Sequence, residues 1–234
     1  MEKYFNFVFS ITEAVLFVFL GLKILFNAII QRKKITIAGV CKLLACLFLS
    51  TSCFISFIPN VFSSILPNDV FYTLKVFSFI MSLIYLNIYF YKMSEIKECK
   101  NKKKNLKMLE IVKKELYFFT AILFTIEVIS VPIFSNSKNY INFYEIIIII
   151  ALLIFLTYQF YLKSKIKNQL IIFPWMYYTI FSIASLTIKS IIENLSINNI
   201  ILILIMSFFN ILQIFILGNI TFFKKDYLGV CLKW

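Results

Sequence analysis

The segment Met93–Glu115, with the sequence MSEIKECKNKKKNLKMLEIVKKE, is the longest polar interruption in an otherwise apolar chain. It holds eight lysines against four glutamates, and it separates three long apolar runs from four that follow. In multi-pass membrane proteins, loops rich in lysine and arginine stay on the cytoplasmic side. This segment therefore predicts the orientation of the whole chain.

The composition predicts a membrane protein. Hydrophobic residues make up 61% of the 234 residues, against about 45–50% in a soluble domain. The excess lies in continuous runs of roughly twenty residues, the length that a helix needs to cross about 30 Å of hydrocarbon. Since the runs do not alternate with polar residues, they favour helices over barrel strands. We expect an all-α, polytopic transmembrane helix bundle.

Seven transmembrane helices are expected, with six as the alternative if the first run or one of the last four is re-entrant. Their predicted ranges are 5–30, 35–58, 70–91, 116–134, 143–162, 170–192 and 200–223. Three helices thus lie in residues 1–92 and four in 116–223. A basic segment, 93–115, separates them, and a short tail, 224–234, follows.

The lysines alternate between successive loops. The loops after the first, third and fifth runs, and the tail, are basic, whereas the other three loops together contain only Lys138. Basic loops stay cytoplasmic, so the N-terminus is expected outside and the C-terminus inside, in the cell membrane. This alternation is what seven single crossings require.

The basic segment has two interpretations. Leu106, Leu109 and Val112 recur at three-residue spacing, which predicts an amphipathic helix on the membrane surface, while the alternative is a solvated loop. No aromatic residue is interleaved with the lysines to stack bases, which excludes a nucleic-acid role. We expect an anionic lipid or a cytoplasmic protein as the partner. The lysines concerned are Lys102, Lys103, Lys104, Lys107, Lys113 and Lys114.

Ionisable residues inside the apolar runs are candidate functional groups, because a charge in the bilayer is costly. Glu127 lies near the middle of the fourth run. Glu13 and Lys75 lie at similar depth in the first and third runs, where they could pair. Lys23 and Lys42 lie near the inner ends of their runs, and their long side chains are expected to reach the interface.

Polar and aromatic residues in the last two runs have structural interpretations. Asn210 and Gln213 share a face of the last helix, and we expect their amides to join neighbouring helices. The segment 174–178, PWMYY, is expected to form a kink and an interfacial aromatic anchor. Asn87 and Gln159 are further candidates for buried polar groups.

Several function classes are excluded by the residues that the sequence lacks. It has no histidine and four glycines, and its five cysteines form no CxxC pair. Histidine-based triads, haem ligation through histidine and the usual zinc sites are therefore excluded. No phosphate-binding glycine loop occurs either. We expect no cofactor, no metal and no enzymatic activity.

One family resemblance starts from the N-terminal run. Ser10, Thr12 and Glu13, the apolar run to Lys23 and the basic pair at 33–34 resemble the membrane sensor region of Agr-type peptide-pheromone receptor kinases. The resemblance implies six or seven short-looped helices and a peptide ligand. Family members continue into a dimerisation helix and a kinase domain, which do not follow the last run here, so phosphotransfer is not expected.

Three functions are compatible with these observations. The first is a receptor-like or immunity-type protein that recognises a peptide or partner at the membrane. The second is a small transporter or permease subunit that uses the intramembrane carboxylates Glu127 and Glu13. The third is a membrane scaffold subunit of a larger complex, docked through the basic segment.

Overall fold

The structure is a computed structural model that describes residues 2–30, 33–55, 68–99, 106–136, 140–165, 172–195, 200–222 and 231–233. These residues form seven long helices and two three-residue strands. The helices are α1 (Glu2–Ile30), α2 (Ile37–Ile55), α4 (Asn68–Cys99), α5 (Leu106–Asn136), α6 (Tyr140–Lys165), α7 (Ile172–Leu195) and α8 (Ile200–Phe222). The strands are β1 (Lys33–Ile35) and β2 (Cys231–Lys233).

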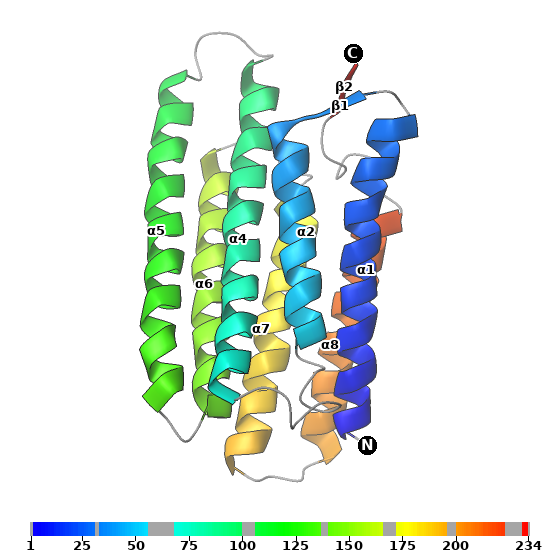
Figure 1. Cartoon of the computed structure of the whole chain (residues 1–234), viewed down its shortest axis with the longest axis vertical. Coiled ribbons are helices and arrows are strands. Elements are labelled where there is room, and N and C mark those ends of the chain that lie inside the picture. Colours follow the sequence, from blue (N-terminus) through cyan, green and yellow to red (C-terminus); the bar gives the residue numbers. More distant parts are fainter. Residues whose placement is uncertain are drawn as a thin grey trace.

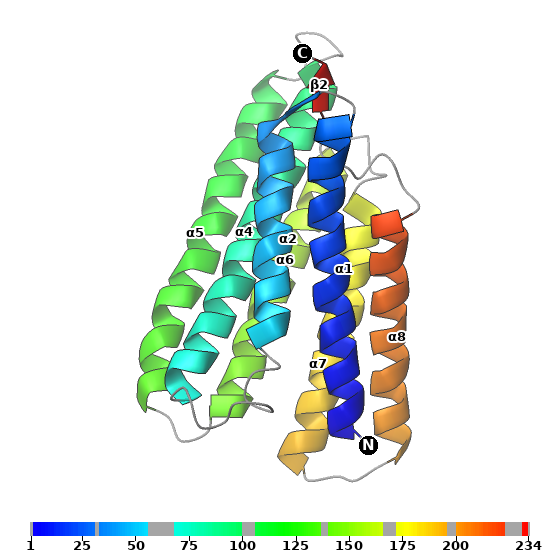
Figure 2. The same cartoon turned by 45° about the vertical axis from the view of Figure 1, so that its right-hand side comes forward.

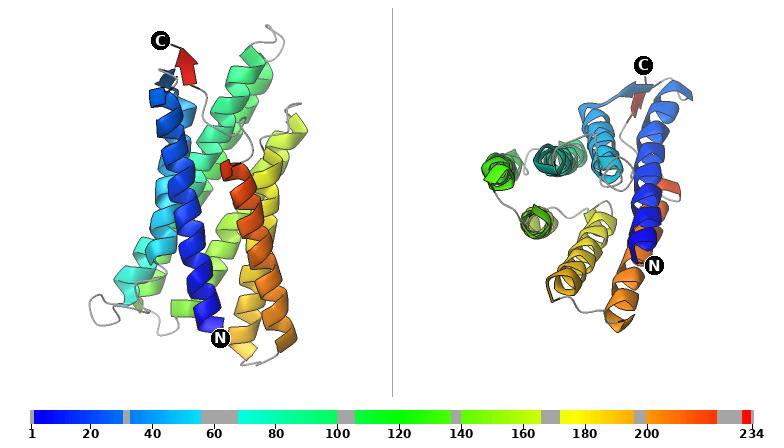
Figure 3. Two further views of the ribbon diagram at one scale, coloured as in Figure 1. Left: turned by 90° about the vertical axis from the view of Figure 1, so that its right-hand side faces the viewer. Right: turned by 60° about the horizontal axis from the view of Figure 1, so that its bottom comes forward.

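The helices form one elongated bundle in which successive helices run in opposite directions (Figures 1 and 2). Neighbours in sequence pack against each other, α1 closes the ring against α8, and α4 also touches α6 (Figure 3). The two chain ends lie at opposite ends of the bundle (Figure 1). We name the end with β1 and β2 the inner end and the opposite end the outer end, following the lysine-based prediction.

Six of the helices are long and apolar enough to cross a membrane: α1, α2, α4, α6, α7 and α8. α5 is not among them over its described residues, and its first turns carry four charges between residues 110 and 115. Nevertheless α4 and α6 both run from the outer end to the inner end (Figure 1). α5 joins them, so it must return the chain across the bundle. The polytopic helix bundle expected from the sequence is confirmed.

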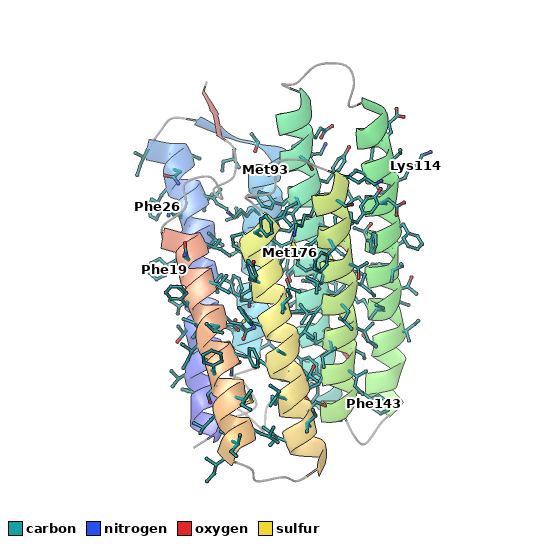
Figure 4. The ribbon with its side chains drawn as sticks, turned by 180° about the vertical axis from the view of Figure 1, so that it is seen from behind. Phe19, Phe26, Met93, Lys114, Phe143 and Met176 are labelled. Atoms are coloured by element: carbon teal, nitrogen blue, oxygen red, sulfur yellow. The ribbon has the colours of Figure 1, made fainter. Side chains whose placement is uncertain are left out.

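The surface along the sides of the bundle is apolar. Phe19 and Phe26 lie on the outward side of α1, whereas Met93 and Met176 lie in the interior (Figure 4). A soluble monomer rarely exposes a large continuous apolar surface, and in a bilayer such a surface meets lipid. Many of the polar side chains within the helices are instead buried among the helices, as expected for a membrane protein.

The basic segment is more helical than predicted. α4 continues to Cys99 and α5 begins at Leu106, so residues 106–115 form the first turns of α5 rather than a separate surface helix. Met93 on α4 and Val112 on α5 are both buried, so the two helices pack into the core beyond the ends of the predicted spans. At 32 and 31 residues these helices are about 48 Å long, longer than the hydrocarbon layer. Lys102, Lys103 and Lys104 lie outside the described residues.

The strands β1 and β2 pair at the inner end of the bundle. β1 and β2 pair antiparallel, with Lys33 opposite Lys233 and Ile35 opposite Cys231. The C-terminal segment therefore lies beside the connection between α1 and α2. Thr36 then caps α2, because its hydroxyl accepts a hydrogen bond from the Gly39 amide at 3.2 Å. Both segments lie at the same end of the bundle, as the alternation of lysines requires.

Candidate functional site

A buried carboxyl group on α1 is the centre of the candidate site. Glu13 is 8% exposed, and its Oε1 accepts a hydrogen bond of 2.7 Å from the hydroxyl of Tyr178 on α7. One turn along α1, the ring of Phe17 meets the Tyr178 ring edge to face, with centroids 6.0 Å apart. These contacts hold the tyrosine against the carboxyl group and join two helices that are not neighbours in the ring.

A thiol on a third helix reaches the same carboxyl group, and a lysine of a fourth helix lies near that thiol. The Cys53 thiol on α2 lies 4.0 Å from Glu13 Oε2, and it interacts electrostatically with both Glu13 and Lys75. Lys75 Nζ lies 3.9 Å from the centroid of the Tyr144 ring on α6. The sequence prediction that Glu13 and Lys75 lie at similar depth therefore agrees with the structure, which places both near Cys53.

The polar contacts continue from Tyr178 onto α8. Ser182 donates a 2.9 Å hydrogen bond to the Tyr178 carbonyl oxygen and accepts one from the Gln213 amide. One turn further, the Ser185 hydroxyl donates to the Asn210 amide oxygen. Asn210 and Gln213 thus lie on one face of α8 and join it to α7, as their spacing predicts.

An ion pair lies toward the outer end of the bundle. Lys189 Nζ on α7 is 2.8 Å from Oε1 of Glu145 on α6, and the Glu145 side chain is only 1% exposed. Neither Glu145 nor Lys189 is among the candidates that the sequence predicts. Glu145 lies two residues inside the predicted fifth helix, where a carboxylate is expected to reach the interface. The signal that could have found the pair is a lysine placed late in the next long helix.

Two lysines lie toward the inner end. Lys23 Nζ donates a 2.5 Å hydrogen bond to the Thr221 carbonyl oxygen, one of the carbonyl groups that the last turn of α8 leaves without a helical partner. Lys42 is fully buried, and its Nζ lies 5.3 Å from the Tyr89 ring centroid. The expectation that Lys42 reaches the interface is wrong, because α1 and α4 cover this face of α2.

The aromatic segment of α7 also differs from its prediction. Trp175 is 1% exposed, and its ring contacts those of Phe90 and Tyr178, with centroids 6.3 and 6.1 Å apart. The interfacial-anchor interpretation is therefore wrong for Trp175 and Tyr178, which face the interior, while Tyr177 is exposed. Pro174 is the third residue of α7, where a helix has no hydrogen bond for proline to remove.

Glu127 lies apart from the contacts around Glu13. Its side chain is buried on the face of α5 that also buries Val112 and Leu123. Among the described elements, the main packing partners of α5 are α4 and α6. Within the described part of the chain, Glu127 Oε2 has no hydrogen-bond partner. The two carboxyl groups predicted from the sequence therefore lie in different surroundings.

Other polar atoms in the interior are available for hydrogen bonding. Both amide atoms of Asn87 and Gln159, the Tyr158 hydroxyl and the Trp175 indole nitrogen are buried, with no hydrogen-bond partner among the residues described. A buried polar group without a partner costs about 1–3 kcal/mol. The interior is thus suited to a polar ligand or to water.

No protein-family model, curated protein or solved structure matches this chain. The class of protein follows from its own fold. The apolar helices and outer surface, with polar side chains buried between the helices, define a multi-pass membrane protein.

Proposed function

We propose that this chain is a non-enzymatic transporter or permease subunit of the cell membrane, which moves a small polar solute through the interior of the bundle. The observation that carries the proposal is the buried Glu13 carboxyl group, hydrogen-bonded to Tyr178 across the bundle. An ionisable group inside a membrane bundle is expensive and is by default a functional group. A carboxyl group can hold a proton or a cationic part of a solute.

Buried polar groups at successive depths support a route rather than a single binding surface. Glu145 lies in the second turn of α6, near the outer end, and Lys42 lies in the second turn of α2, near the inner end. Glu13 and Tyr178 lie between them. A sensor of an external ligand needs polar contacts near the outer end, whereas here they continue to the inner half.

The residues around Glu13 allow its carboxyl group to bind a cation of the solute at one time and Lys75 of the chain at another. Tyr178 donates a hydrogen bond to one oxygen, and among the described residues the other oxygen has only the Cys53 thiol, 4.0 Å away, as a donor. Lys75, which rests on the Tyr144 ring near the same thiol, is a cation of the chain itself that can take the place of a bound cation. Such competition would allow a solute to be released.

The experiment is a transport measurement on purified protein in liposomes, with L-alanine, L-lysine, L-glutamate and trialanine as solutes. We expect a saturable transport current for at least one of them. Glu13→Gln should reduce it at least tenfold, while Glu110→Gln, an exposed glutamate on α5, should leave it unchanged. Equal currents in the wild type and Glu13→Gln would refute the role of Glu13.

Two other results would favour the functions expected from the sequence. Saturable peptide binding without any current would favour the receptor-like function that the resemblance to pheromone sensors implies. Co-purification of a cytoplasmic protein that depends on the lysines of residues 93–115, again without current, would favour the scaffold function.

A further inference from the structure

We propose that Lys42 is an anion-binding residue of the bundle interior and that the ligand it binds carries a carboxylate. Lys42 is 0% exposed, and its Nζ has no hydrogen-bond partner in the described ranges. The Tyr89 ring, 5.3 Å away, lies within the distance of a cation–π contact. One ring face does not replace the three hydrogen bonds that an ammonium group donates.

The described residues give the Lys42 ammonium group no counter-charge. Over the described residues, no carboxylate lies within ion-pair distance of Lys42, and three of the buried or half-buried glutamates have other partners: Glu13 with Tyr178, Glu95 with Lys92, and Glu145 with Lys189. Lys23 on α1 is close enough to interact electrostatically with Lys42. Two neighbouring lysines on adjacent helices therefore create a positive region in the inner half, which favours an anion.

The position of Glu13 selects the kind of anion. Cys53, which contacts Glu13, and Lys42 are eleven residues apart on α2, which is about three helical turns and about 16 Å along one face. The same face thus presents a negative site and then a positive site along the bundle. A solute that carries both an amine and a carboxylate can meet the negative site and the positive site in turn, whereas a multivalent anion such as phosphate would be repelled near Glu13.

A purely structural role does not account for Lys42. A buried charge without a partner destabilises a fold, and replacing it with an apolar side chain of similar volume is often neutral or stabilising. We therefore expect Lys42→Met to fold and to melt at the same or a higher temperature, while losing anion binding. This combination separates a binding residue from a packing residue.

The test uses acetate as the minimal carboxylate and Trp175 as the reporter. The chain has two tryptophans, so Trp234→Phe leaves the signal of Trp175, which contacts Phe90 beside Tyr89. Purified protein in detergent is titrated with sodium acetate that replaces sodium chloride at constant ionic strength. We expect a saturable fluorescence change, with the dissociation constant raised about ten- to a hundredfold in Lys42→Met.

Matched variants make the outcome decisive. Lys113→Met removes the same charge from an exposed position on α5 and should bind acetate as the wild type does, and Lys23→Met should weaken binding a few-fold. A non-saturable response in the wild type, equal binding in Lys42→Met, or a lower melting temperature for Lys42→Met and Lys42→Gln would each overturn the proposal. The proposal rests on the proposed function only in placing the ligand inside the bundle, and the transport test at Glu13 can fail independently of it.

Discussion

The hydroxyl of Tyr178 donates a 2.7 Å hydrogen bond to the carboxyl group of Glu13, although 165 residues separate the two in the chain. It is a direct polar contact between α1 and α7, two helices that both pack against α8. Four helices meet around it through Cys53 and Lys75. The buried polar groups near Glu13 therefore come from four different helices.

The first prediction concerns this hydrogen bond. Tyr178→Phe removes the donor and keeps the ring, so it should destabilise the protein by about 0.6–1.7 kcal/mol, the range found for hydrogen bonds between membrane helices. Glu13→Gln and the double variant complete the cycle, measured as thermal unfolding in detergent. The two changes should be non-additive. Full additivity would show that the two side chains do not interact.

The second prediction concerns Glu127. Because α5 lies at the edge of the bundle and Glu127 is not connected to Glu13, Glu127→Gln should leave the transport current within twofold of the wild type. Its melting temperature should be unchanged or slightly higher, since a neutral amide is cheaper to bury than a carboxylate. A loss of current as large as that in Glu13→Gln would show that the route passes along α5.

The third prediction concerns the contact between α1 and α2. A Cβ atom on Gly21 would lie 3.3 Å from Leu43 Cδ1 and 3.6 Å from Cys46 Cβ, whereas one on Gly218 would meet nothing within 4 Å among the described residues. Gly21→Leu should destabilise the protein by about 1–3 kcal/mol through overpacking. Gly218→Leu is the control, and it should be neutral or stabilising. Equal melting temperatures would contradict the close packing of α1 on α2.

The fourth prediction concerns the two hydrogen bonds between α7 and α8, Ser185 to Asn210 and Gln213 to Ser182. Gln213→Leu and Asn210→Leu each remove the partner of a buried serine on α7, so each should cost about 0.6–1.7 kcal/mol. Thr187→Val is the control, since the exposed Thr187 hydroxyl donates a hydrogen bond to a carbonyl of its own helix. Unfolding measured in detergent should show a clear loss for the two amides. An equally large loss of unfolding free energy in Thr187→Val would show that the hydrogen bonds between α7 and α8 contribute nothing specific.

The helices could be predicted from the sequence because a spanning segment is set by length and composition alone. The spacing of Asn210 and Gln213 is also informative, because two amides one turn apart in a largely apolar helix indicate a face that points toward a neighbouring helix. Helix ends were less predictable. α4 extends to Cys99 because residues such as Met93 still pack against other helices, although the charges nearby favoured a loop.

The contacts of the site were harder to predict than the helices. In a continuous apolar run no periodicity shows which face points inward, so Tyr178 could not be distinguished from an interfacial tyrosine, which has the same apolar ring and polar hydroxyl. The position of Lys42 near a helix end predicts that its side chain reaches the interface. Only the packing of α1 and α4 around it shows that it is buried. Glu145 was missed for a similar reason.

The central claim is that the chain crosses the membrane seven times with its basic end inside, which places the polar groups from Glu145 to Lys42 across the bilayer. The most direct test labels single cysteines with a non-permeant thiol reagent, in a variant whose five cysteines are replaced by alanine. We predict that Asn198→Cys is labelled on whole cells and that Lys103→Cys is labelled only after permeabilisation. Labelling of Lys103→Cys on whole cells, or protection of Asn198→Cys until permeabilisation, would contradict this account.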